Sequence, residues 1–102
     1  MNIQFEGKIK MKNLIDTLML LKLLQFLTQE KGFIIAKVKN DEIKLTKTIL
    51  PAADSERSSD GDAVELEVEI EVSEGTTEIE VECAKLEHIK DIVSEIAALI
   101  DS

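Results

Sequence analysis

Two neighbouring segments of the chain alternate strictly between apolar residues and glutamate, and this alternation constrains the fold more than any other feature. Residues 64–72 read VELEVEIEV and residues 76–84 read TTEIEVECA, with a Glu-Gly pair in the connection. Strict alternation is typical of strands with one buried face, because successive side chains point to opposite sides. The segments therefore predict an antiparallel hairpin with Ile70 opposite Ile79, since a shift of one residue would bury the glutamates.

The same register gathers glutamates on the other side of the hairpin. This acidic face comprises Glu65, Glu67, Glu69, Glu71, Glu78, Glu80 and Glu82. Like charges directly opposite each other destabilise a sheet, so the face needs solvent or a basic neighbour. One interpretation is a solvated face that opposes aggregation. A second is pairing with basic strand residues of the same chain or of a second chain, and this basic complement comprises Lys37, Lys39 and Lys44.

A third interpretation is that the acidic face binds a basic partner protein by imitating the phosphate backbone of a nucleic acid. Charge is divided unevenly along the chain. Residues 1–50 carry nine Lys and five acidic residues, whereas residues 51–102 carry three basic and sixteen acidic residues, for a net charge of -9. Such a chain is not expected to bind nucleic acid or an anionic membrane itself, because those surfaces require clustered Lys and Arg.

Residues 13–31 predict a helix with Asn13 as its N-cap and Gly32 just beyond its end. The apolar residues point in almost every direction around the axis, which is typical of a helix that is covered on most sides. Polar residues interrupt the run too often for a membrane span. One small sheet covers one side, so we expect a second copy of the chain to cover the other. The expected dimer core is Leu14, Ile15, Leu18, Met19, Leu21, Leu23, Leu24, Phe26 and Leu27.

The rest of the first half predicts strands. Residues 2–11 alternate as a half-buried strand, with Gly7 on the apolar side as a bulge. Residues 33–48 predict a hairpin around an Asn-Asp turn, with Val38 opposite Ile43 and Ala36 opposite Leu45. Lys37 then lies opposite Lys44, which gives the hairpin a basic outer face.

Residues 85–100 predict an amphipathic helix, since apolar residues recur there at spacings of three and four. The loop at 51–63 is acidic and flexible by composition, and it could serve as a tether or a mobile segment. These elements predict one α+β domain over residues 1–102, in the order β-α-β-β-loop-β-β-α, as an intertwined homodimer.

Few residues suggest chemistry. A single Cys excludes an internal disulfide, and Cys83 shares an apolar face, which favours a small buried side chain. His88 lies three residues before Asp91 on the last helix, where it is either an exposed His or a base or metal ligand. Residues 54–62 partly match a calcium-binding loop, so weak binding of a divalent cation is a further alternative. We expect no cofactor and no enzymatic activity.

The helix at residues 14–27, the acidic hairpin and the closing helix at residues 85–100 together resemble a small acidic archaeal orphan family of unknown function. This resemblance implies an α+β fold built as an interdigitated homodimer. From Phe5 to Cys83 the chain also resembles the small amphi-Trp domains, although it lacks the Trp that closes that family's pattern. Neither resemblance implies catalytic residues.

The sequence thus predicts a cytoplasmic, non-enzymatic homodimer with a structural or protein-interaction role. Abundant Glu and Lys with few Asn and Gln also favour a thermophilic source. The absence of an early apolar run with a small-residue cleavage site argues against a secretory signal.

Overall fold

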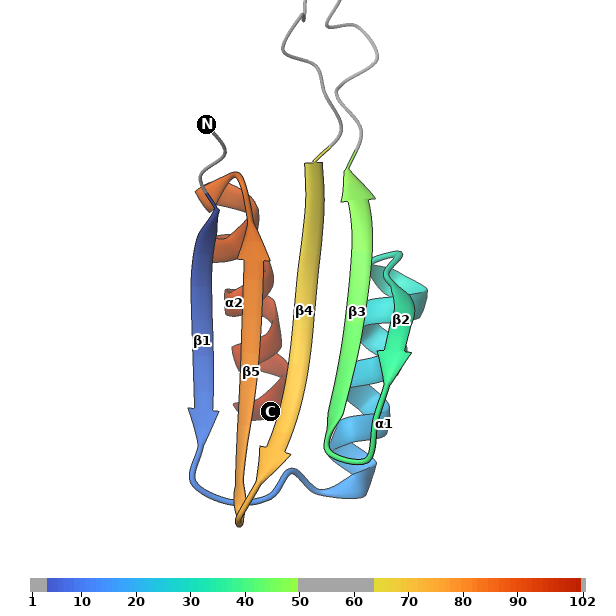
Figure 1. Cartoon of the computed structure of the whole chain (residues 1–102), viewed down its shortest axis with the longest axis vertical. Helices are drawn as coiled ribbons and strands as arrows, with labels where there is room; N and C mark the ends of the chain where they lie inside the picture. Colours follow the sequence, from blue (N-terminus) through green and yellow to red (C-terminus); the bar gives the residue numbers. More distant parts are fainter. Residues whose placement is uncertain (1–3, 50–63, 102) are drawn as a thin grey trace, which may run out of the picture.

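The computed structural model describes residues 4–49 and 64–101 of the chain, which form a five-stranded antiparallel sheet and two helices (Figure 1). The α+β class and the order β-α-β-β-β-β-α confirm the prediction, while the loop at 51–63 lies outside the described residues. The strands are β1 (Phe5–Met11), β2 (Ile34–Val38), β3 (Glu42–Ile49), β4 (Val64–Ser73) and β5 (Thr76–Cys83). The helices are α1 (Thr17–Gln25), which continues into the π-helical segment η1 (Phe26–Glu30), and α2 (Leu86–Asp101).

The strands lie in the order β1-β5-β4-β3-β2, so the first strand pairs with the last. Both helices lie on one side of the sheet, with α2 behind β1 and β5 and α1 behind β3 and β2 (Figure 1). Within residues 4–49 and 64–101, no element covers the other side of the sheet, which we call the open side (Figure 1). The core lies between sheet and helices and includes Leu45, Val68, Ile79, Val81 and Ile96, each 0% exposed. No helix within residues 4–49 and 64–101 is long and apolar enough to cross a membrane.

The register of the β4–β5 hairpin confirms the prediction, with Ile70 opposite Ile79 and Glu69 opposite Glu80. The register of β2 with β3 confirms the predicted pairs Val38–Ile43 and Lys37–Lys44, but the prediction fails beyond Lys37. Ile35, rather than Ala36, lies opposite Leu45, because an irregularity between Ile35 and Lys37 shifts the pairing by one residue. A bulge of this kind inserts one extra residue into a strand, and alternation alone does not reveal it.

Gly7 does not form a bulge, so the bulge predicted for the strand at residues 2–11 was wrong. It lies in regular register opposite Val81. Its role is close packing, because a Cβ atom there would lie 2.9 Å from Ile89 Cγ2 and 3.2 Å from Val93 Cγ2. The missing side chain therefore lets α2 approach β1.

Helix α1 begins at Thr17 with Asp16 as its N-cap, and not at Asn13. The buried Thr77 hydroxyl accepts a hydrogen bond from the Ile15 amide at 2.8 Å and donates one to the Asn13 carbonyl at 3.1 Å. These contacts hold the preceding segment in a non-helical path across the end of the sheet. The helical stretch ends at Glu30 with Lys31 as its C-cap, and Gly32 follows with φ of +80°, as expected of a glycine beyond a helix C-terminus.

Candidate functional site

The acidic face lies on the open side of the sheet, away from both helices. Its residues alternate along β4 and β5 with the buried apolar residues, so each glutamate points to solvent. Glu6 of β1 lies opposite Glu82, and Glu42 of β3 lies opposite Glu71, so both flanking strands add further carboxylates to this side.

Lysines from the flanking strands partly neutralise the acidic face. Lys8 Nζ on β1 lies 3.7 Å from Oε2 of both Glu78 and Glu80. Its pKa is raised from the ordinary value by the charges of Glu78, Glu6 and Glu80, in that order. On the other flank, Lys44 Nζ lies 3.5 Å from Glu67 Oε2.

These ion pairs form within one chain. Acidic and basic strands therefore pair with each other, as one interpretation of the sequence expected. The sequence favoured such pairing between two chains, and these ion pairs do not support that exchange of strands. Of the basic complement, Lys44 alone makes such a pair among the described residues. Lys37 lies on the edge strand β2, opposite Lys44 of β3, and Lys39 lies in the connection between these two strands. A hydrogen bond to Lys39 and the charge of that residue lower the Lys37 pKa.

Three carboxylates of the open side crowd together where β1, β5 and the end of the sheet meet. Glu6, Glu80 and Glu82 each offer one oxygen within 4.8 Å of the others, a spacing that could hold a metal ion. The pKa of Glu80 is raised to about 7 by the hydrogen bond that its protonated form donates to Glu6, by partial burial and by the negative charge of Glu6, against the opposing effect of Lys8. The crowding follows from the strand register, which places Glu6 opposite Glu82 and next to Glu80. The calcium-like segment at 54–62 lies outside the described residues.

The expected dimer core divides between two environments. Leu23 and Leu27 are 0% exposed and belong to the core of the single chain. Ile15, Leu24 and Phe26 pack against that core and are partly buried, and Met19 is also partly buried. The remaining three, Leu14, Leu18 and Leu21, are exposed, with Leu18 at 68%. One side of α1 is therefore covered by its own sheet and the other is not.

The edge strand beside α1 is exposed as well. Within the described residues β2 pairs with β3 alone, and all five of its residues are exposed. Ile34 is 66% and Val38 is 64% exposed. Because α1 lies behind β3 and β2 (Figure 1), the exposed helix residues and the exposed strand belong to the same edge of the molecule. We call this edge the α1–β2 edge, comprising Leu14, Leu18, Leu21, Ile34, Ile35 and Val38.

Cys83 lies fully buried in the core, as the sequence predicted, and it is a free thiol. No protein-family model matches the chain, and no curated protein matches it either.

Proposed function

We propose that the protein is a non-enzymatic homodimer with a structural or protein-interaction role, and that its subunits associate through the α1–β2 edge. The observation that carries the proposal is the exposure of Leu18 and Leu21 on α1, since soluble chains rarely leave neighbouring large apolar side chains in water. The described sheet is complete within one chain, which supports association of two folded subunits.

A second copy of the chain fits this edge by its residue spacing. Leu18 and Leu21 lie three residues apart on α1, which is a spacing found at the seam between two packed helices, and Leu14 adds a further exposed apolar side chain just before the helix begins. A twofold axis would place α1 against α1, because such a symmetric contact uses the same patch on both subunits. Lys37 on β2 opposes the addition of a further strand, so the helix supplies the main contact.

The test is the mass of the chain in solution, measured by light scattering coupled to size-exclusion chromatography. At micromolar concentration we expect the wild type to have the mass of two chains. Leu18→Glu should give the mass of one chain and unchanged far-ultraviolet circular dichroism, because Leu18 contributes little to the core of its own subunit. Leu86→Glu is the matched control, since Leu86 is exposed on α2, outside the α1–β2 edge. A single-chain mass for the wild type would overturn the proposal.

A second candidate function is binding of a basic protein surface by the acidic face. It is favoured by the open side of the sheet, where glutamates from β1, β3, β4 and β5 outnumber the lysines that pair with them. A line of carboxylates steers basic partners by electrostatic attraction that salt screens.

Immobilised chain should then capture a basic protein from a native lysate at low ionic strength and release it at high ionic strength. The double variant Glu69→Gln and Glu71→Gln should weaken capture, whereas Glu74→Gln and Glu87→Gln, outside the face, should not. Equal capture by both pairs of variants would argue against this function.

A further inference from the structure

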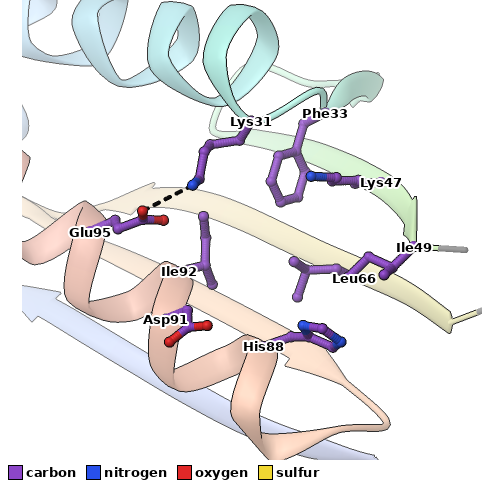
Figure 2. A pocket seen from close by; sticks show the side chains of 9 residues that line it. All are labelled: Lys31, Phe33, Lys47, Ile49, Leu66, His88, Asp91, Ile92 and Glu95. Atoms are coloured by element: carbon purple, nitrogen blue, oxygen red, sulfur yellow. Dashed lines mark hydrogen bonds and ion pairs between the residues drawn. The ribbon is translucent and has the colours of Figure 1, made fainter. Parts of the chain in front are cut away.

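A pocket opens on the helix-covered side of the sheet, between the end of η1, strands β3 and β4, and the first turns of α2 (Figure 2). Its volume is about 140 Å³, below the roughly 300 Å³ at which pockets for drug-sized ligands begin. Apolar side chains such as Leu66 and Ile92 form its floor, and charged side chains stand around it.

Lys47 is the unexpected member of this pocket. By register it shares the helix-facing side of β3 with Ile43, Leu45 and Ile49, and it lies opposite Leu66. Among the described strands it is the one charged residue on that side, where all other positions are apolar, Gly or Thr. A charged residue on a core-facing position costs stability unless it has a partner.

Within residues 4–49 and 64–101, Lys47 makes no ion pair. The other ammonium at the pocket is already engaged, because Lys31 Nζ lies 2.9 Å from Glu95 Oε2. The Lys47 side chain passes beneath the turn at Gly32, where a Cβ atom would lie 3.8 Å from Lys47 Cε. Lys47 therefore reaches the pocket as a cation without an ion-pair partner among the described residues.

His88 and Asp91 face Lys47 across the pocket, from the first turns of α2 (Figure 2). The imidazole supplies a second donor, and the carboxylate lies one helical turn further on. A cation and an imidazole above an apolar floor match a ligand with one carboxylate and a short apolar body, since a few polar groups orient a ligand that apolar contacts hold.

We propose that this pocket binds a small monocarboxylate with a short apolar body, with Lys47 as the partner of the carboxylate and His88 as a second donor. The inference is independent of the homodimer, because no residue of the α1–β2 edge lines the pocket.

Isovalerate is the probe, followed by two-dimensional NMR. His88 is the single histidine of the chain, so its ring protons report on the pocket without overlap. We expect saturable shifts of these protons, and of amides near Lys47 and Leu66, at millimolar ligand. Lys47→Met keeps the apolar stem and should weaken binding about tenfold or more, as loss of a charge-assisted hydrogen bond does. Lys39→Met, on the exposed turn, is the matched control.

Two further ligands separate the chemical requirements. Isovaleramide has the same shape without the charge, and equal binding of it would overturn the assignment to Lys47. Inorganic phosphate has charge without an apolar body, and equal binding of it would overturn the role of the apolar floor. The proposal is also overturned if isovalerate shifts no resonance of His88, or binds Lys47→Met as well as the wild type. Thermal unfolding of Lys47→Met, with a midpoint at or above that of the wild type, establishes that this variant is folded.

Discussion

At the scale of the residue, Glu80 shows how the register between two strands changes the pKa of a side chain. Cross-strand pairing brings the carboxyl groups of Glu6 and Glu80 together, and they share a hydrogen bond that requires a proton. The pKa of Glu80 is therefore raised to about 7, even though Lys8 Nζ lies 3.7 Å away and acts in the opposite direction. Alternation in the sequence predicted the acidic face, but it did not predict which carboxylates would share a proton.

This raised pKa predicts a pH dependence of stability. A carboxyl group with a higher pKa in the folded state binds its proton more tightly there, so it stabilises the fold at low pH and loses that effect as pH rises. The free energy of unfolding should thus contain a contribution that is complete below pH 4.5 and lost as pH rises through about 7. Urea unfolding across this range measures it.

Glu80→Gln should remove this contribution and flatten the profile, because the amide does not titrate. Glu65→Gln, on the same face but outside the cluster, is the matched control and should leave the slope intact. A wild-type profile that rises between these pH values would contradict the assignment.

At the scale of the element, the sequence predicted those structures whose pattern is local. The β4–β5 hairpin follows from its own alternation, and α2 follows from its own apolar stripe. The start of α1 does not, because the contacts of Thr77 with Ile15 and Asn13 decide it from far along the chain. Lys47 breaks the alternation of β3, and its position in a pocket depends on α2 and η1, which the pattern of β3 does not encode.

The packing of α2 on β1 supplies a prediction at this scale. Gly7→Ala should destabilise the fold by about 1–3 kcal/mol, because the added methyl group meets Ile89 Cγ2 at 2.9 Å and forces the helix outward. Equilibrium unfolding in urea measures the change. Ile89→Leu removes the branched methyl group at the contact, so the double variant should lose less than the sum of the two single variants. If the losses of unfolding free energy in the two single variants simply add in the double variant, then contact with Ile89 does not explain why a glycine is needed at position 7.

At the scale of the whole molecule, Thr77 joins parts that are distant in sequence. Its hydroxyl fixes the segment that carries the chain from β1 past the ends of β5 and β4 to α1 (Figure 1). Thr77→Val keeps the shape but leaves the Ile15 amide without its acceptor, which should cost about 1–3 kcal/mol of unfolding free energy. Thr76→Val, whose hydroxyl donates to the Ser73 carbonyl in an exposed turn, is the control and should cost about 0.5 kcal/mol or less. Equal losses would contradict the clamping role of Thr77.

The pairing of β1 with β5 has a consequence for the order of events at the ribosome. The strands from β2 to β5 pair with their neighbours in sequence, but β1 must wait until β5 has been made. Helix α1 likewise emerges before every strand that later lies in front of it (Figure 1). During synthesis the apolar side chains of α1 are therefore exposed before the strands that cover them are made, and exposed apolar surface of this kind is where nascent chains are most prone to aggregate.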